Sequence, residues 1–486
     1  MKKQITRREV LYLSAGLLAG SAVPTLLADR KTLRPLIQHF QHLLPIPPVL
    51  TPIRRDATTD YYEVSQLESQ LEILPGLCTT IWGYEGMFPG PTFHAWRGRR
   101  VVVQHTNRLA VPTVVHLHGG ATPPDSDGFP TDMILPDQSR TYVYPNTQRA
   151  ATLWYHDHVM DHTGRNMYMG LAGFYLLRDE EEASLRLPEG PYDVPLLIQD
   201  RLFASDGQFV YDTFRHLAAK GGIILVNGAP WPRMAVAARK YRFRILNGSN
   251  ATPLRLALSS GQPLLQIATD GGLLPTPVSS PNIPLAMAER IEIVVDFSEY
   301  PVGTKIILQN LNNKEISGEF SDQIMRFDVV RTEKDDSLVP SRLSNFVRLN
   351  QSAAVQTREF IFSGNPSGLP PIVNWHINGK DFDPDIPIAS PEYGNCEIWH
   401  VSNKKFLGLL GLVHPVHIHL VNFQILERNG GPPFPHERGW KDTVAVDKAD
   451  DVKLLMRFDG YKGRYLMHCH NLEHEDHSMM ARFDVV

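Results

Sequence analysis

The segment His468-Cys469-His470, followed by His474 and Met479, brings residue types that bind soft metal ions close together in the chain. In an extended strand successive side chains point to opposite faces, so Cys469 faces one way and its two histidine neighbours face the other. A cysteine thiolate, two imidazoles and a weak axial methionine form the ligand set of a blue-copper electron-transfer centre. One short strand is therefore predicted to serve two metal sites.

Three further clusters of histidines show the same close spacing. In each His-x-His pair the strand period of two places both imidazoles on one face, which a shared metal cluster requires. Ten of the twenty histidines lie in four short windows, and composition gives no reason for such bunching. For any single histidine, and for the other ten, a core or surface position is the simpler interpretation. The three further clusters contain His116, His118, His156, His158, His414, His417 and His419.

Taken together, the four motifs resemble those of three-domain multicopper oxidases, closest to the bacterial spore-coat laccase and bilirubin oxidase branch. They have the forms H-x-H-G, H-x-H, H-x-x-H-x-H and H-C-H-x3-H-x4-M, with every ligand position filled. The likeness runs from about residue 45 to residue 486 and includes YEGMFPGPTF, GLAGFYLLRD, VNGAPWPRM, YRFRILNGSN and GWKDTVAVD. It implies an all-β chain of three cupredoxin-like Greek-key β-sandwich domains.

The resemblance also implies four copper ions with separate ligand sets. The type 1 copper would be held by His414, Cys469 and His474, with Met479 as its axial ligand. Spacing from Cys469 is the only reason to prefer Met479 to Met480, for which we expect a packing role. The type 2 copper would be held by His116 and His417. The type 3 pair would take three ligands for each ion, from His118, His156, His158, His419, His468 and His470.

Two carboxylates near the motifs match acids that the resemblance places beside the copper cluster. Asp127 and Glu475 are expected to relay the protons that oxygen reduction consumes. The simpler interpretations are an Asx turn before Gly128 for Asp127, and a pairing with a neighbouring base for Glu475. Asp157 lies between two ligands of one strand and should point away from them, so we assign it no catalytic role.

Length and composition favour the same architecture. A chain of 486 residues suits about three domains. Short apolar runs punctuated by 38 prolines and 35 glycines, such as 101–104, 196–199, 291–295 and 423–426, are typical of β-sandwiches. We expect the first domain at 31–180, the second at 190–332 and the third at 345–486. The second domain contains His216 as its only possible imidazole ligand, so we expect it to be a structural spacer. Linkers are expected near 179–182 and 331–342.

Residues 1–30 resemble a twin-arginine export signal. Arg7-Arg8 precedes a short apolar stretch, Val10 to Val23. An uncleaved membrane anchor is the alternative, although the apolar run is shorter than a comfortable span. We therefore expect an exported protein, periplasmic or extracellular in a bacterium.

Net charge and cysteine content limit the kinds of binding partner and covalent cross-link that we expect. The net charge is −4 and no basic stripe lies outside the signal, which argues against nucleic acid. With Cys469 assigned to copper, Cys78 and Cys396 are expected to be ordinary buried thiols, and a disulfide between them is the alternative. We expect a monomer that acts on a small reducing substrate and O2.

The expected reaction takes single electrons from a substrate at the type 1 copper and reduces O2 to water at the other three. Phenols, aromatic amines and bilirubin-like pigments are the expected donors, approaching an exposed edge of a type 1 histidine between the loops 403–413 and 428–440. A cuprous or ferrous oxidase is the second candidate, but the thirteen methionines are dispersed. Three other classes of protein fit the sequence less well. A non-catalytic envelope protein on this scaffold would tend to lose copper ligands, and a simple electron carrier would need only the type 1 ligands. A copper nitrite reductase subunit is usually shorter than this chain.

Overall fold

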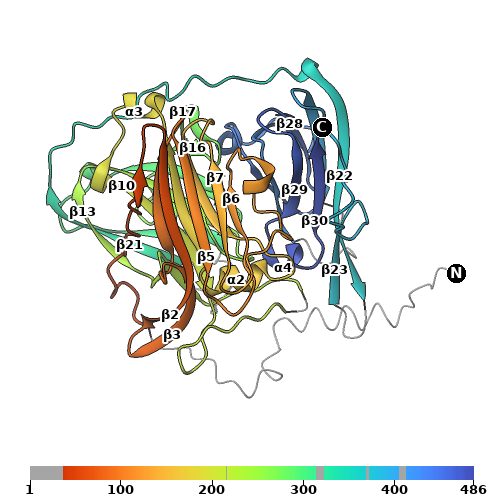
Figure 1. Ribbon diagram of the computed structural model, residues 1–486. Coiled ribbons are helices and arrows are strands. Elements are labelled where there is room, and N and C mark those ends of the chain that lie inside the picture. Colours follow the sequence, from red (N-terminus) through yellow and green to blue (C-terminus); the bar gives the residue numbers. More distant parts are fainter. Residues whose placement is uncertain (1–36, 215, 313–321, 368–371, 404–411) are drawn as a thin grey trace, which may run out of the picture.

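The structure, a computed structural model, describes residues 37–214, 216–312, 322–367, 372–403 and 412–486. Strands make up most of the regular structure in these residues, and the helices are short (Figure 1). Within the described ranges, no helix is long and apolar enough to cross a bilayer. The expected export signal at 1–30 lies outside the described residues.

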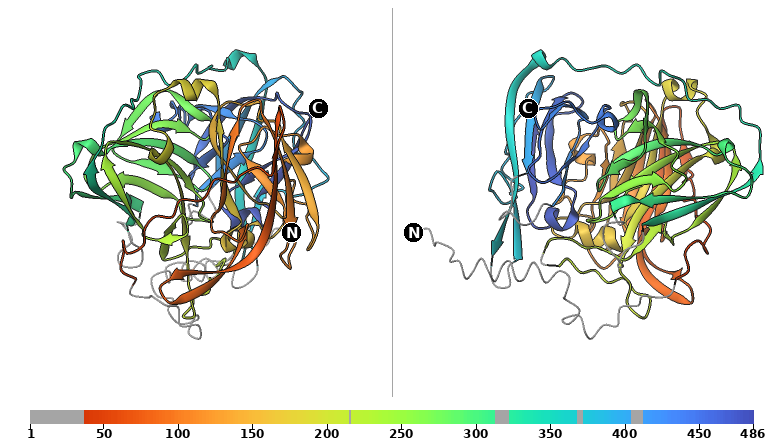
Figure 2. Two further views of the ribbon diagram at one scale, coloured as in Figure 1. Left: turned by 60° about the vertical axis from the view of Figure 1, so that its left-hand side comes forward. Right: turned by 180° about the vertical axis from the view of Figure 1, so that it is seen from behind.

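The strands form six sheets, in three pairs that follow one another along the chain. We call these the first part (residues 54–178), the middle part (193–332) and the last part (354–485). Figure 2 shows the last part (blue) beside the first part (orange), with the middle part (green) on the other side. The all-β fold class is confirmed, and the proposed domain boundaries stay predictions.

The first part contains a sheet of order β1-β2-β5-β7, with β3 also paired to β2, and a second sheet of order β4-β9-β8-β6. The predicted run at 101–104 lies within β5. The strands are β1 (Arg54–Arg55), β2 (Thr59–Leu74), β3 (Leu77–Tyr84), β4 (Gly90–Trp96), β5 (Arg100–Asn107), β6 (Val115–His118), β7 (Ser139–Tyr144), β8 (Ala151–Asp157) and β9 (Ala172–Arg178).

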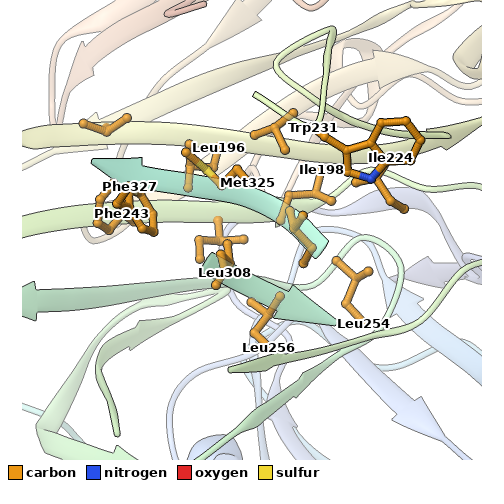
Figure 3. Close-up of a cluster of buried hydrophobic side chains, with 14 of the residues drawn as sticks. Leu196, Ile198, Ile224, Trp231, Phe243, Leu254, Leu256, Leu308, Met325 and Phe327 are labelled. Atoms are coloured by element: carbon orange, nitrogen blue, oxygen red, sulfur yellow. The ribbon is translucent and has the colours of Figure 1, made fainter. Parts of the chain in front are cut away.

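The middle part has sheets of order β12-β11-β10-β14-β19-β16-β17 and β13-β21-β20-β15-β18. Its core lies between them: Phe243 of one sheet and Phe327 of the other have ring centroids 5.0 Å apart (Figure 3). The strands are β10 (Asp193–Arg201), β11 (Ile223–Val226), β12 (Ala229–Pro230), β13 (Arg233–Ala238), β14 (Lys240–Asn247), β15 (Leu254–Leu258), β16 (Leu264–Thr269), β17 (Gly272–Ser280), β18 (Ile283–Leu285), β19 (Arg290–Asp296), β20 (Lys305–Asn310) and β21 (Gln323–Thr332).

The last part has sheets of order β23-β22-β24-β28-β26 and β27-β25-β29-β30. The other predicted runs, at 196–199, 291–295 and 423–426, lie in β10, β19 and β26. The strands are β22 (Ala354–Ser367), β23 (Ile372–Ile377), β24 (Cys396–Asn403), β25 (His414–Ile418), β26 (Phe423–Arg428), β27 (Thr443–Val446), β28 (Asp451–Arg457), β29 (Gly463–Cys469) and β30 (Met480–Val485).

Three short α-helices lie between these strands in the described residues: α2 (Thr163–Met169), α3 (Glu180–Ser184) and α4 (Leu472–Glu475). Helix α2 of the first part lies beside α4 of the last part (Figure 1), where Gly164 N donates to Asp476 Oδ2 at 2.9 Å. This contact joins residues 312 positions apart and ties the first part to the last part.

The acidic run at 179–182, near which the sequence predicts a linker, lies between the first part and the middle part and is folded. It forms the start of α3, capped by the Asp179 side chain, which accepts from Glu182 N. Glu182 is buried and accepts hydrogen bonds from Arg242 and Arg244 of the middle part at 2.7 and 2.8 Å. A buried carboxylate needs such partners, so this run fixes the first part against the middle part.

The three cysteines all lie in the described residues and are free. Cys78 is exposed, Cys396 is partly exposed and Cys469 is buried. Cys78 and Cys396 are unpaired as expected, but the expectation that both are buried is wrong.

Candidate metal centres

Strands β6 and β8 of the first part and β25 and β29 of the last part bring the clustered histidines together. In the register of each ladder, His116 lies opposite His156 and His417 lies opposite His468. Directly opposed residues project from the same face of a sheet, so each ladder presents paired imidazoles to the seam between the two parts. The eight that meet there are all buried: His116, His118, His156, His158, His417, His419, His468 and His470.

These eight histidines fall into one pair and two triads. The pair is His116 and His417, whose Nε2 atoms are 3.4 Å apart. One triad whose ligand atoms converge is His118, His156 and His470. The other is His158, His419 and His468.

Hydrogen bonds fix where the protons of the pair lie. His116 Nδ1 donates to the Asp127 carbonyl at 2.5 Å, and His417 Nδ1 donates to the Asp442 carbonyl at 2.9 Å. A backbone carbonyl only accepts, so both Nδ1 atoms carry the proton and both Nε2 atoms present a lone pair. Two lone pairs that face each other repel, and a cation between them removes the repulsion.

The triad of His158, His419 and His468 repeats this arrangement with carboxylates behind it. His419 Nδ1 donates to Asp127 Oδ2 at 2.7 Å. The Glu475 oxygens lie 3.3 Å from His158 Nδ1 and 3.0 Å from His468 Nδ1. The Nε2 atom of His468 is then 3.3 Å from His158 Nε2 and 3.2 Å from His419 Nε2. The Nε2 atoms of the three histidines therefore converge on one point.

In the other triad the unprotonated nitrogen is Nδ1 in His118 and Nε2 in His156. His118 Nε2 lies 3.2 Å from Asp442 Oδ1, and His156 Nδ1 donates to the Asp157 carbonyl at 2.8 Å. The opposite nitrogens, His118 Nδ1 and His156 Nε2, are 3.4 Å apart. Neither ring nitrogen of His470 has a hydrogen-bond partner, although the residue is buried. A buried polar atom without a partner is costly, and a metal ion would satisfy it.

Burial also sets the charge of these groups. It lowers the pKa of the His158 imidazole to about 4, and lowers the pKa of His116, His118 and His468 well below the usual value. Neutral imidazoles are the form that binds metal ions. Burial acts in the opposite direction on the acids behind them: it raises the pKa of the Asp127 carboxyl well above its usual range and also raises that of Glu475.

A second site lies within the last part, at the end of β29. Cys469 Sγ is 3.5 Å from His414 Nδ1 and 3.5 Å from His474 Nδ1, and these two nitrogens are 3.1 Å apart. His474 Nε2 donates to the Leu217 carbonyl at 3.0 Å, which leaves its Nδ1 unprotonated. Burial lowers the pKa of His414 to about 3 and raises that of the Cys469 thiol well above its usual range. A bound cation would stabilise the thiolate that burial disfavours.

The structure also separates the two neighbouring methionines. Met480 lies opposite His468 in the ladder of β29 and β30, and packs with Phe129 and Leu466. Met479, one residue earlier, is fully buried in the same core cluster as Cys469. Because side chains alternate along a strand, Met479 shares the face of Cys469 and Met480 does not.

Several groups that position the candidate ligands were not found from the sequence. Asp442, beside His118, is held by Arg290 of the middle part at 2.5 and 2.7 Å. Its segment GWKDTVAVD already carried the family resemblance, and that was the only available signal. The middle part, expected as a spacer, therefore also helps to hold the histidine cluster in place.

Asp157 turns away from the histidine cluster and accepts from the backbone of Val114 and Val159 at 3.0 and 3.1 Å. The expected exposed edge of a type 1 histidine is wrong, because both His414 and His474 are buried. The loop expected to frame that edge includes residues 404–411, which lie outside the described residues.

Known proteins are similar to this chain over most of its length. Models described as multicopper oxidase match residues 67–182 and 347–486. The chain is 36% identical to a laccase of Bacillus subtilis strain 168, covering 92% of this chain and 99% of the relative. It is also 36% identical to a bilirubin oxidase of Albifimbria verrucaria, over 91% of this chain and 80% of the relative.

The chain belongs to the multicopper oxidase family. A solved multi-copper oxidase from Pediococcus acidilactici superposes with a TM-score of 0.85 at 32% identity, covering 94% of this chain and 95% of that one. The protein is therefore a copper-binding, laccase-like oxidoreductase that uses O2 and a small-molecule substrate, on a cupredoxin-like all-β scaffold. The family resemblance seen in the sequence is confirmed.

Proposed function

We propose that this multicopper oxidase binds four copper ions and couples one-electron oxidation of a small organic donor to four-electron reduction of O2. The observation that carries the proposal is the set of unprotonated imidazole nitrogens that face one another at 3.2–3.4 Å inside the seam. The lone pairs of these nitrogens repel one another in the absence of cations, and bound cations would remove that repulsion.

The proposed ligand sets follow the groupings of the structure. His116 and His417 would hold the type 2 copper. Cys469, His414 and His474 would hold the type 1 copper, with Met479 axial, a donor set that matches a blue-copper centre. The type 3 pair would be held by the triads His118, His156 and His470, and His158, His419 and His468.

Bound copper would supply one-electron redox chemistry at the Cys469 site and the reduction of O2 to water at the histidine cluster. The chain itself links the two. His468 and His470 flank Cys469 in sequence, so a short covalent path joins the thiolate to one histidine of each triad. The hydrogen bonds of His116 and His419 to Asp127 keep their Nδ1 protons in place and aim their Nε2 atoms into the seam, and the Glu475 carboxylate lies 3.0–3.3 Å from the Nδ1 atoms of His468 and His158.

Asp127 and Glu475 are also the proposed proton donors. Each is fully buried and lies directly behind the cluster, and burial raises the pKa of each carboxyl. A raised pKa lets a carboxyl hold a proton close to neutral pH and release it to a nearby reduced oxygen species. The Asx turn and the simple ion pair remain the alternative roles for these two residues.

Phenols, aromatic amines and bilirubin-like pigments are the proposed donors, as the names of the laccase and bilirubin oxidase relatives suggest. Ferrous and cuprous ions are the alternative. We further propose that the protein is exported through the twin-arginine signal at Arg7-Arg8 and works as a periplasmic or extracellular monomer.

One set of measurements on purified, copper-loaded protein tests the proposal. We expect four copper ions per chain, a blue absorption band, and O2 consumption with guaiacol and bilirubin that exceeds the rate with Fe(II) or Cu(I). A colourless protein with full copper would contradict the type 1 assignment. A faster reaction with either metal ion would replace the proposed donors.

A further inference from the structure

A cavity of about 410 Å³ opens beside the segment that leads from the middle part into the last part. Residues of this segment, 346–351, form one wall, and strand β26 and the loop 432–439 supply the others. The volume falls within the range of small-molecule sites, which begins at about 300 Å³. None of the lining residues is a candidate copper ligand, so the cavity is not part of the two metal sites.

Hydrogen bonds fix the walls of the cavity in place. Gln424 of β26 is buried and holds the connecting segment at two points. Its Nε2 donates to the Val347 carbonyl at 2.7 Å, and its Oε1 accepts from Leu349 N at 3.0 Å. On the other side, Gln266 Nε2 of the middle part donates to the His436 carbonyl at 3.1 Å. The cavity is therefore a preformed feature of the fold, as small-molecule sites usually are.

Apolar side chains supply much of the lining. They include Phe346, Leu349 and Ile425, together with the two successive prolines Pro432 and Pro433. None of these side chains has a hydrogen-bonding atom, and Phe346 offers a ring that can stack on another ring. The lining therefore favours the body of an aromatic ligand over a fully hydrated one.

Two arginines of the lining have no acidic partner among the described residues. The exposed Arg348 side chain makes no ion pair or hydrogen bond with any of them. Arg438 donates only from Nε to the Pro433 carbonyl, at 3.3 Å. The one acidic lining residue, Glu437, is buried and already paired with Arg428 at 2.5 Å. The lining thus carries positive charge that no carboxylate of these residues offsets, which suits an anion.

We propose that this cavity binds a small aromatic carboxylate, with its ring against the apolar lining and its carboxylate held by Arg348 and Arg438. An apolar lining alone would suit any apolar molecule, and two arginines alone would suit any small anion. The two together select a ligand that carries both features, because a guanidinium matches a carboxylate with parallel N–H donors. The site goes beyond the proposed oxidase function and does not depend on it, since binding involves no electron transfer.

Isothermal titration calorimetry on the copper-loaded full chain tests the site with three probes. We expect naphthalene-2-carboxylate to bind at one site per chain. Acetate keeps the charge and lacks the rings, whereas naphthalene-2-carboxamide keeps the rings and lacks the charge. Each of these should bind at least about tenfold more weakly. Acetate binding as strong as that of the naphthoate would reduce the cavity to a general anion site, and equally strong binding of the carboxamide would remove the role of the arginines. Either result would overturn the proposal.

Two substitutions and a matched control locate the binding. Arg348→Gln and Arg438→Gln should each weaken naphthoate binding roughly tenfold, because each removes one charge-assisted contact. The control Arg108→Gln, at an exposed arginine of the first part, should leave the affinity unchanged. Wild-type affinity in both cavity variants, or equal weakening in the control, would contradict the assignment of the site.

Oxidase turnover separates the cavity from the donor site. A naphthoate concentration that saturates the calorimetric site should leave the KM for guaiacol unchanged, and so should both arginine substitutions. A competitive rise in that KM would place the naphthoate at the type 1 site and refute binding in the cavity. These outcomes count only against the cavity. A failure of the proposed function itself would show in the wild-type enzyme without naphthoate, as a missing blue band and no O2 consumption.

Discussion

The two candidate metal sites are built in different ways. The type 1 site takes His414, Cys469, His474 and Met479 from the last part alone. The histidine cluster takes four residues from the first part and four from the last, on strands that only meet when the two parts dock. The first site is therefore set by the folding of one sheet pair, whereas the second depends on the interface between two.

The surroundings of the sites differ as well. Behind the cluster lie the carboxylates of Asp127, Asp442 and Glu475, each close to a histidine nitrogen. The outward nitrogen of the type 1 histidine His474, Nε2, instead donates to a neutral carbonyl, that of Leu217. Several cations in one seam need negative charge nearby, while a single electron-transfer ion does not. Substitutions in one region should thus leave the other intact.

The largest effect is expected from Cys469→Ser, which removes the thiolate at the junction of the two sites. We expect loss of the blue band and a fall in oxidase turnover of at least about a thousandfold, or roughly 4 kcal/mol of barrier. The cluster ligands His468 and His470 remain, so most copper of the cluster should stay bound. Copper content, absorption and O2 consumption measure this together. Oxidase activity near the wild-type rate would refute the path through Cys469.

Asp442→Asn should affect the histidine cluster and spare the type 1 site, which is the opposite of what we expect for Cys469→Ser. The variant removes the closest charged partner of the buried Arg290 and leaves Asp270 at 3.8 Å, so the loss of unfolding free energy should reach at most about 3–5 kcal/mol. It also loosens His118, so cluster copper should fall while the blue band persists. Denaturant unfolding and copper content provide the measurements. The control Asp336→Asn, at an exposed ion pair with Lys334, should change stability by less than about 1 kcal/mol. Equal effects of the two variants would mean that Asp442 does not support the cluster.

The sequence predicted the histidine cluster better than it predicted the groups that hold the candidate ligands in place. Spacing alone placed the His-x-His pairs on shared strand faces, and the alternation around Cys469 separated it from its neighbours, as the ladders of β6, β8, β25 and β29 show. Local rules suffice there because side-chain direction in a strand is local. The Leu217 carbonyl could not be predicted, because a backbone group has no sequence signature and the contact joins residues 257 positions apart. The same long-range cover explains why the expected exposed histidine edge was wrong.

A smaller effect, confined to the cluster, is expected for Glu475→Gln. Glutamine keeps the shape of the side chain, but it cannot donate an acidic proton. We expect reoxidation of the reduced enzyme by O2 to slow by about a hundredfold. Anaerobic reduction of the type 1 site by ferrocyanide should keep its rate, because that step does not involve Glu475. Stopped-flow absorption follows both steps. Slowing of both to the same extent would indicate a structural defect instead of a lost proton donor.

The smallest effect is expected at Met479, and it sharpens the description of the type 1 site. Met479→Leu removes a weak axial donor and keeps an apolar side chain of similar volume in the core. Because the donor stabilises the more highly charged oxidised ion, its loss should raise the type 1 reduction potential, with the blue band and copper content retained. Met480→Leu is the matched control: that residue packs with Phe129 and Leu466, so the potential should stay unchanged. Spectroelectrochemical titration measures both variants. A shift in the control with none in Met479→Leu would transfer the axial role to Met480, against the alternation of side chains along this strand.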